Sequence, residues 1–320
     1  MALLCPGQGA QRVGMARDLA EAFPAARAAL EAVDEALGFA LSAVMWNGPE
    51  ELLTRTDHAQ PAILAHSWAV WAVAGPALGA RGPVAAAAGH SLGEYSAYVA
   101  AGSLSGEEAA RLVRRRGELM RDAGVQRPGT MAAVMGLDAE QVGAICREAS
   151  GKDGVVVAAN LNAPDQVVIS GDPAAVARAG ELLKAAGAKR VIPLKVSGAF
   201  HSPLMDSAAK RLAEELDRTA IRDARCPVIA NVSAAPVQRA EEIRDALERQ
   251  VLGAVRWEES MRRLLELGAE GFVEIGAGRV LRGLLRSVDK SAASWNVEDP
   301  ATLAAALGEL GAPGLVTEGR

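Results

Sequence analysis

The sequence predicts an α/β protein with a mostly parallel main sheet and a small inserted unit of ferredoxin-like type. Over residues 1–122, short apolar runs alternate with longer helical patterns, which is typical of a parallel sheet covered by helices. Between Met131 and Leu194 the order changes to β-α-β-β-α-β, the ferredoxin-like arrangement. The first alternation then resumes, so we expect the large unit to be discontinuous in sequence.

The first part of the chain contains two expected strands and four expected helical regions. The strands cover residues 2–5 and 84–88, and the helices cover residues 14–37, 61–74, 92–101 and 106–122. The uncharged window 62–80 is about as long as a membrane span. Because the window also contains a histidine, a serine and Gly75 followed by Pro76, we expect a buried helix that ends near Ala74 instead.

The inserted unit occupies the middle of the chain. Its strands are expected at residues 131–135, 155–159, 166–170 and 189–194, with helices at 138–149 and 173–186. Pro128 and Gly129 precede this unit and the segment 196–200 follows it, and both suit crossings between domains. We therefore assign residues 129–195 to a small ferredoxin-like domain, and residues 1–128 and 196–320 to a large α/β domain.

After the insert, the alternation of helical and apolar patterns returns. It predicts a helix from Pro203, strands at 226–232 and 271–275, helices near 239–251 and 257–267, and a helix from Gly278. Residues 311–320 are expected to form a frayed tail.

Composition limits the class of protein and its partners. Half of the 320 residues are hydrophobic but only 3% are aromatic, so the core must consist mainly of Ala, Val, Leu and Ile. A net charge of -5 gives no general attraction for nucleic acid or for anionic membranes. The three cysteines lack metal-ligand spacing, which indicates free thiols in a reducing compartment. The N-terminus has no basic region before its apolar run, so we expect no signal peptide and a cytoplasmic location.

Residues 89–93 fit the G-x-S-x-G pattern around Ser91. An apolar run precedes the pattern and a helical one follows it, which is the setting of a nucleophile elbow; the alternative is a tight turn without a catalytic role. The backbone N–H of Leu92 would lie in the first turn of the helix, where it could bind a developing oxyanion. The loop 6–11, at the end of the first strand, is a candidate for the second donor.

A serine nucleophile needs a base, and the chain has four histidines. His66 lies in an apolar helix, where a core role is expected, and His58 lies in a polar stretch that we expect to be exposed. His90 neighbours Ser91, but adjacent side chains diverge at a sharp turn. His201, just before an expected helix start, is the best candidate base. No Asp or Glu that would orient it can be identified, and a backbone carbonyl or amide could do so.

Arg116 gives information about the substrate. It falls near the centre of the apolar stripe of the helix 106–122, which consists of Ala109, Leu112, Val113, Leu119 and Met120. Arg114 and Arg115 point away and are expected to be solvated. A buried arginine needs an anionic or polar partner, which is either an internal salt bridge or a substrate carboxylate. In the second case the acyl group bears a free carboxylate, as in the monoester or monothioester of a diacid.

Six motifs carry a resemblance to a known family. They are PGQGAQ at 6–11, GHSLGEYSA at 89–97, RRRGELM at 114–120, NAPDQVVISG at 162–171, SGAFHSPLM at 197–205 and GRVLRGLL at 278–285. Their order and spacing over residues 3–309 resemble the malonyl-CoA:acyl carrier protein transacylases of fatty acid synthesis and the related acyltransferase domains of polyketide synthases. The resemblance implies a hydrolase-like large domain with a ferredoxin-like insert. It also implies transfer of malonyl from malonyl-CoA to the phosphopantetheine thiol of acyl carrier protein, in a ping-pong reaction through a malonyl-serine.

The resemblance also implies roles for particular residues. It makes Ser91 the nucleophile, His201 the base, Gln8 and Leu92 the oxyanion hole, Arg116 the partner of the malonyl carboxylate and Gln250 the main-chain carbonyl that orients the histidine. It places Phe200 and His90 at the substrate, with Phe200 narrowing the space beside the α-carbon. Two positions depart from the family pattern. Cys5 stands where an aromatic residue is common, and Ala254 stands where proline is usual. Neither removes a catalytic group, but Ala254 raises the question of how Gln250 is positioned.

The partners and the rival activities follow from the same resemblance. No metal or redox cofactor is implied, since malonyl-CoA and phosphopantetheine are substrates, and a monomer is expected. Carrier proteins of this family are acidic, so docking should use a basic patch, for which the candidates are Lys184, Lys189, Arg190, Arg282 and Arg286. The alternative functions are a serine hydrolase and an enzyme that edits acyl chains on a polyketide synthase.

Overall fold

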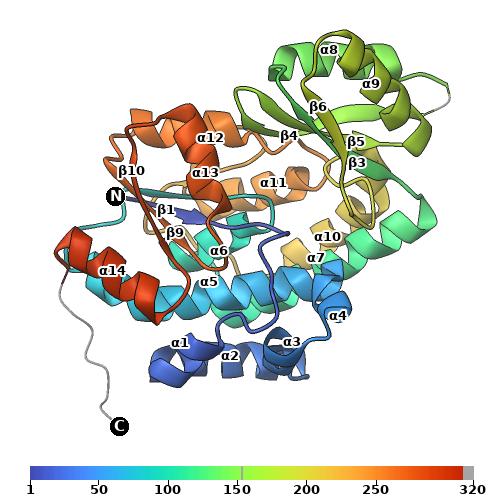
Figure 1. Cartoon of the computed structure of the whole chain (residues 1–320). Coiled ribbons are helices and arrows are strands. Elements are labelled where there is room, and N and C mark those ends of the chain that lie inside the picture. Colours follow the sequence, from blue (N-terminus) through green and yellow to red (C-terminus); the bar gives the residue numbers. More distant parts are fainter. Residues whose placement is uncertain (153, 313–320) are drawn as a thin grey trace.

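The computed structural model describes residues 1–152 and 154–312, which fold around two sheets (Figure 1). The larger sheet has the strand order β10-β9-β1-β2-β7-β8. Its parallel strands are β10 (Ala293–Val297), β9 (Gly271–Ile275), β1 (Ala2–Cys5), β2 (Ala86–Gly89) and β7 (Val228–Ile229). The short edge strand β8 (Pro236–Val237) pairs antiparallel with β7. The predicted parallel main sheet is therefore confirmed.

The central strands are apolar along their whole length because both faces of the sheet are covered. Every residue of β1 and β2 is buried. Leu3 and Ala87 belong to a core on one face of the sheet, whereas Leu4 and Ala88 belong to a second core on the other face. This alternation places successive side chains on opposite faces, as the pleat requires.

The helices divide between the two faces. The first core contains residues from α2 (Pro24–Leu37), α5 (Thr56–Gly79), α6 (Gly93–Ala100), α7 (Gly106–Gln126), α10 (Asp206–Arg218), α11 (Ala240–Gln250) and α14 (Pro300–Leu310). The second core is formed with α12 (Trp257–Glu266) and α13 (Val280–Val288). The long helices α5 and α7 pack against each other beneath the sheet (Figure 1).

The largest differences from the predicted helix ranges occur in the first part of the chain. The expected helix 14–37 is broken into α1 (Arg17–Ala22) and α2, because Phe23 is extended and Pro24 starts the next helix. The expected helix 61–74 is longer at both ends and continues through Pro76. By length and composition α5 could cross a membrane, but 67% of its apolar window is buried inside the fold.

The start of α5 shows how the fold accommodates a proline inside a helix. Pro61 has no N–H, so it cannot bond to the carbonyl of Asp57 one turn earlier. That carbonyl accepts a hydrogen bond from Arg114 Nη1 of α7, at 2.7 Å. A side chain of the neighbouring helix therefore replaces the missing bond, which allows α5 to begin a full turn before the proline.

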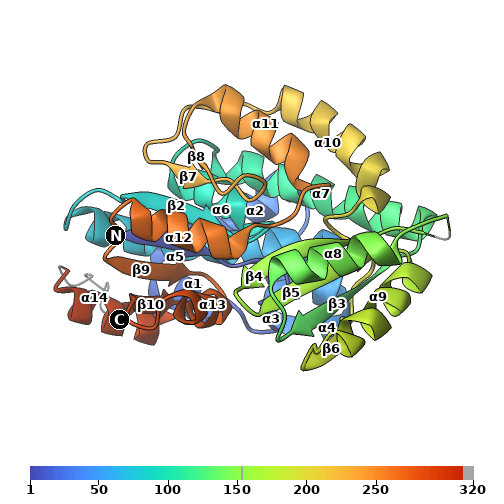
Figure 2. The ribbon, with the colours of Figure 1, turned by 90° about the horizontal axis from the view of Figure 1, so that it is seen from above.

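The smaller sheet has the order β4-β5-β3-β6 with antiparallel pairing throughout. Its elements are β3 (Thr130–Met135), α8 (Ala139–Ala149), β4 (Val156–Ala163), β5 (Gln166–Gly171), α9 (Pro173–Ala185) and β6 (Arg190–Pro193). This is the predicted ferredoxin-like unit, whose helices enclose a separate apolar core. Seen from above, it lies beside the main sheet, with β4 next to α12 and α13 (Figure 2). The domain boundaries at 129 and 195 stay a prediction.

Other differences concern short elements. The expected strand 226–232 shrinks to the two residues of β7, because the chain turns back after Ile229 and Ala234 takes a positive φ of 52°. The helix expected from Pro203 begins as a 3-10 turn, η1 (Pro203–Met205). The patterns did not predict α3 (Leu41–Asn47), α4 (Glu50–Thr54), β8, β10 or α14. Of the predicted frayed tail, residues 313–320 lie outside the described residues.

Candidate active site

Ser91 lies on a sharp turn between β2 and α6. Its φ is 50°, a left-handed conformation that non-glycine residues rarely adopt. The flanking glycines are required by close backbone approach. A Cβ at Gly89 would lie 1.9 Å from the carbonyl carbon of Gly93, and a Cβ at Gly93 would lie 2.1 Å from Cys5 O. The predicted elbow geometry is therefore present, and it exposes the Ser91 side chain at the end of the parallel strands.

His201 is hydrogen-bonded to Ser91. The distance between Ser91 Oγ and His201 Nε2 is 2.8 Å. The other ring nitrogen, Nδ1, lies 2.9 Å from Gln250 O and 3.1 Å from Gly253 O. Because carbonyl oxygens only accept hydrogen bonds, the proton is on Nδ1 and Nε2 is free to accept the serine proton. Burial and the positive charge of Arg116 lower the pKa of His201 to about 3, so the ring is neutral near pH 7.

Gln250 keeps its expected position beside His201 although Ala254 replaces the usual proline. Gln250 ends α11, and its carbonyl reaches the histidine although residue 254 is not proline. The segment that follows is held by β4, since Val255 N donates to Ala159 O and Val255 O accepts from Leu161 N, both at 2.8 Å. Gly253 therefore supplies a second carbonyl to the histidine, a contact that no pattern in the sequence predicted.

Arg116 is only 1% exposed and lies at Ser91. Its Nη2 donates to Ser91 Oγ at 3.1 Å and to Gln250 Oε1 at 3.0 Å, and its Nη1 donates to Gln60 Oε1 at 2.7 Å. Among the described residues, no carboxylate forms an ion pair with it, and its Nε has no hydrogen-bond partner. The internal salt bridge is thus not formed, and burial lowers the pKa of Arg116. A buried cation with neutral partners next to a serine is suited to an incoming anion.

Two residues that line the same cavity as Ser91 have backbone N–H groups available to a ligand. In the described part of the chain, the amides of Gln8 and Leu92 donate to no other protein group. Leu92 directly precedes α6, and Gln8 lies in the loop after β1. The Gln8 side chain donates to Thr56 Oγ1 at 3.3 Å, which in turn lies 3.0 Å from Ser197 Oγ. This arrangement suits the binding of an oxyanion between the two amides.

A cavity of about 900 Å³ opens at these groups. Residues of both sheet units line it; besides the predicted Gln8, His90, Ser91, Leu92, Arg116, Phe200 and His201, they include Asn160, Asn162, Gln166, Leu194, Val280 and Leu284. His90 does not turn toward Ser91. Its Nε2 lies 2.8 Å from Asn162 Oδ1 and its ring packs against Trp257. The volume is sufficient for a ligand of the size of the pantetheine arm.

The other two histidines have structural surroundings. His66 is buried in α5 and its Nε2 lies 2.7 Å from Glu298 O, so the expected core role is confirmed. The expectation that His58 is exposed is wrong. It lies in the first turn of α5, packs against Phe39 and is covered by α7, with Arg114 Nη1 3.3 Å from its Nδ1. Burial lowers the pKa of His58.

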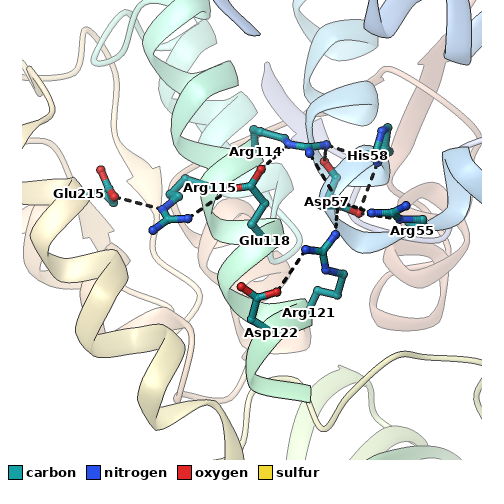
Figure 3. A network of polar contacts seen from close by, with 9 residues as sticks. All are labelled: Arg55, Asp57, His58, Arg114, Arg115, Glu118, Arg121, Asp122 and Glu215. Carbon is teal, nitrogen blue, oxygen red and sulfur yellow. Dashed lines mark hydrogen bonds and ion pairs between the residues drawn. The ribbon is translucent and has the colours of Figure 1, made fainter. Parts of the chain in front are cut away.

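A network of charges joins the two helices that carry Gln60 and Arg116 (Figure 3). At its centre the carboxylate of Asp57 is 0% exposed and lies 2.9 Å from Arg55, 2.5 Å from Arg121 and 3.5 Å from Arg114. Arg114 is therefore not a solvated residue as expected. Burial alone would raise the pKa of Asp57, but hydrogen bonds from Arg55 and His58 hold it below its usual value. Arg115 connects the network to Glu215 on α10.

The pattern reasoning missed three polar residues at the site. Gln60 binds Arg116, and Asn231 and Glu94 contact the Ser91 turn or its neighbours. All three are buried. Asn231 lies in the apolar run 226–232, which is a usable signal because a buried polar residue needs a partner, whereas Gln60 lies in the polar stretch 55–60. In the described part of the chain, no group of three His, Cys, Asp or Glu residues is arranged to hold a metal ion.

Comparison with known proteins extends over nearly the whole chain. A family model described as an acyl transferase domain matches residues 2–308. A malonyl CoA-acyl carrier protein transacylase from Bacillus subtilis is 45% identical over 307 residues, which cover 96% of each chain. The solved structure of a malonyl CoA-acyl carrier protein transacylase from Coxiella burnetii has a TM-score of 0.91 at 37% identity and covers 97% of both chains.

A second solved structure contains a partner. It is a type II PKS acyl-carrier protein in complex with its malonyl-transacylase, with a TM-score of 0.90, 42% identity and coverage of 96% of this chain and 99% of that chain. These neighbours and the two sheets confirm the predicted fold class, a hydrolase-like α/β unit with a ferredoxin-like insert. Because one family model matches residues 2–308 and a relative is 45% identical over 307 residues, the chain belongs to the acyltransferase family that contains the malonyl-CoA:acyl carrier protein transacylases.

Proposed function

We propose that the protein transfers malonyl from malonyl-CoA to the phosphopantetheine thiol of acyl carrier protein. The observation that carries this proposal is the buried guanidinium of Arg116, which lacks a carboxylate partner among the described residues and lies 3.1 Å from Ser91 Oγ. An acyl group held on Ser91 with a carboxylate of its own would supply the missing anion. The malonyl specificity in the names of the similar proteins supports the same substrate.

In the first half-reaction, Ser91 Oγ attacks the thioester carbonyl carbon while its proton passes to His201 Nε2. The tetrahedral oxyanion is bound by the N–H groups of Gln8 and Leu92, and each such donor is worth about 10² to 10³ in rate. The C–S bond then breaks, and the coenzyme A sulfur leaves with the proton from His201. Malonyl remains as an ester on Ser91, with its carboxylate bound to Arg116.

In the second half-reaction, the phosphopantetheine thiol occupies the place of coenzyme A. His201 takes the thiol proton, and the sulfur attacks the ester carbonyl. The bond between the acyl carbon and Ser91 Oγ breaks, and Oγ recovers the proton from His201. These groups provide the nucleophile, the base and the charge stabilisation, so we infer that the reaction uses no metal or redox cofactor.

Selectivity has two sources in this proposal. Arg116 favours acyl groups with a free carboxylate over acetyl, because a bidentate carboxylate partner satisfies its charge. Phe200 lines the cavity and is almost fully buried. It would disfavour methylmalonyl by restricting the space at the α-carbon, and one methyl group changes binding by about 1 to 3 kcal/mol.

The setting of the reaction is part of the proposal. The complex of a similar malonyl-transacylase with its acyl-carrier protein supports a carrier as the acceptor, for fatty acid or polyketide synthesis. We infer a monomer in the cytoplasm that binds neither nucleic acid nor membrane. The net charge of -5 supports the lack of affinity for nucleic acid and membrane, and the buried, free cysteines support the cytoplasm. The monomer stays a prediction.

The test is intact-mass measurement after brief mixing with malonyl-CoA. We expect a malonyl adduct on the wild type and none on Ser91→Ala, and we expect holo acyl carrier protein to remove the adduct much faster than water does. An adduct that persists in Ser91→Ala would contradict the serine mechanism. Equally fast loss of the adduct with and without the carrier would favour the serine hydrolase.

A further inference from the structure

Asn231 contacts the Ser91 turn with both ends of its side-chain amide. The residue follows β7 and is buried. Its Oδ1 accepts from Ser91 N at 2.7 Å, and its Nδ2 donates to Gly89 O at 2.7 Å. One side chain therefore binds the backbone on both sides of His90.

The turn at Ser91 depends on outside partners for these groups. Ser91 is in the left-handed region with φ 50°, where a residue with a side chain is disfavoured. Its N–H precedes α6 and has no carbonyl of that helix within reach. Without Asn231, a buried donor and a buried acceptor would lose their bonds, and the strained turn would lose the contact that spans it.

Asn231 is itself held in place through its backbone. Its N–H donates to Glu94 Oε2 at 3.1 Å, and its carbonyl accepts from Arg256 N at 3.0 Å. Glu94 also accepts from Gln250 Nε2 at 2.8 Å, and the same Nε2 donates to Ser91 O at 2.9 Å. The Ser91 N–H is thus connected to the buried Glu94 through Asn231, and the Ser91 carbonyl is connected to it through the Gln250 side chain.

We propose that Asn231 is a positioning residue for the transfer reaction, which holds the Ser91 turn so that Oγ faces His201 and the neighbouring Leu92 N–H faces the oxyanion. This inference rests on the proposed function, because it concerns the rate at which Ser91 accepts malonyl. Asn231 lies outside the residues that line the cavity, so it acts through Ser91 and not on the substrate.

The chemistry of the amide makes the proposal testable by a single substitution. The position needs an acceptor for Ser91 N–H and a donor for Gly89 O. In Asn231→Asp the protonated carboxyl supplies both, whereas the ionised carboxylate only accepts and opposes the Gly89 carbonyl. Glu94 on α6 accepts from the Asn231 backbone, and His90 lies between the two backbone groups that Asn231 binds. Arg116 on α7 and His201 reach the same turn through Ser91 Oγ. Burial raises the pKa of Glu94 to about 7, so its negative charge increases toward alkaline pH and further disfavours a second anion.

The experiment measures the single-turnover rate of malonyl transfer to Ser91 by rapid mixing and intact mass, from pH 5 to pH 8. For Asn231→Ala we expect a loss of about 10²-fold at unchanged half-saturation by malonyl-CoA, because small misplacement of a reacting group has effects of that size. For Asn231→Asp we expect the rate relative to wild type at the same pH to rise as the pH falls. The matched control is Asn296→Ala on β10, which removes a side-chain amide that donates to Gly278 O. This variant should stay within about twofold of wild type.

Several outcomes would overturn the inference. These are an Asn231→Ala variant that is acylated at the wild-type rate, a loss that Asn296→Ala reproduces, or an Asn231→Asp rate whose ratio to wild type is independent of pH. Circular dichroism checks that each variant is folded. If Asn231→Ala does not fold, the pH dependence of the Asn231→Asp rate tests the proposal. A wild type that forms no malonyl adduct would instead refute the proposed function.

Discussion

At Arg116 the role of substrate clamp can be tested by changing the acyl group. In Arg116→Ala the malonyl carboxylate would be buried without its cation. Hydrogen bonds to charged groups contribute about 1.5 to 3 kcal/mol each, so the loss of two predicts a decrease of at least about 10²-fold in acylation by malonyl-CoA. Intact-mass kinetics with malonyl-CoA and acetyl-CoA measure it. Acetyl-CoA is the internal control, because it lacks the carboxylate; an equal decrease with both substrates would show that Arg116 only supports the fold.

Single residues were predictable where their chemistry leaves a local pattern. The glycines around Ser91 mark a turn with close backbone approach, and the apolar stripe of α7 showed that Arg116 is buried. No local pattern marks the partners of Asn231 and Gln60. Their roles depend on residues more than 50 positions away, since Asn231 bonds to Ser91 and Gln60 to Arg116. A sequence shows that a buried amide needs partners but not which partners it finds.

At the scale of elements, Asp57 should hold α5 against α7. Asp57→Asn would leave Arg114, Arg121 and Arg55 without their shared anion. Removing one partner of a buried ion pair costs about 3 to 5 kcal/mol. Because Arg55 is 48% and Arg121 34% exposed, solvent screens part of this effect and we expect a decrease of about 2 kcal/mol in the free energy of unfolding.

Urea denaturation of Asp57→Asn measures this effect, with Glu215→Gln as the control for a partly exposed pair at the edge of the network. The pKa of Asp57 is lowered in the folded protein, so its contribution is present above the ordinary value of 3.8 and is lost as the pH falls through the lower folded pKa. The difference between wild type and variant should therefore shrink in strong acid. A variant as stable as wild type at pH 7 would show that the network is not a structural connection.

Helices and strands were predicted well where the hydrophobic pattern extends over many residues. They were predicted poorly where contacts with other elements decide where they begin and end. All six elements of the ferredoxin-like unit appear in the expected order. The start of α5 was predicted at Pro61 because a proline usually marks a helix boundary. The helix begins earlier because Arg114 binds the Asp57 carbonyl that the proline leaves without a partner. The expected strand 226–232 has only two paired residues because the chain reverses direction soon after them. Tertiary contacts that no local window contains decide both cases.

At the scale of the whole molecule, the site depends on contact between the two sheet units. The segment 253–255 pairs with β4 of the smaller sheet and also supplies the Gly253 carbonyl to His201. The cavity has walls from both units. This arrangement was not predictable from periodicity, because the residues of β4 that bond to Val255 lie about a hundred positions earlier in the chain. The smaller unit therefore helps to set the orientation of the histidine as well as the shape of the cavity.

The charge distribution of the whole molecule makes a last prediction about the carrier. The net charge of -5 gives an acidic carrier no general attraction, so docking needs local cations. Arg190 at the edge strand β6 and Arg286 on α13 are exposed, and α13 also contributes Val280 and Leu284 to the cavity wall.

Reversing both charges, in Arg190→Glu with Arg286→Glu, should lower kcat/KM for the carrier about tenfold at low salt, because like charges then repel. Transfer to free pantetheine, an uncharged acceptor, is the control and should not change. The defect should weaken at high salt, where charges are screened; an unchanged kcat/KM for the carrier, or an equal loss with pantetheine, would place docking elsewhere.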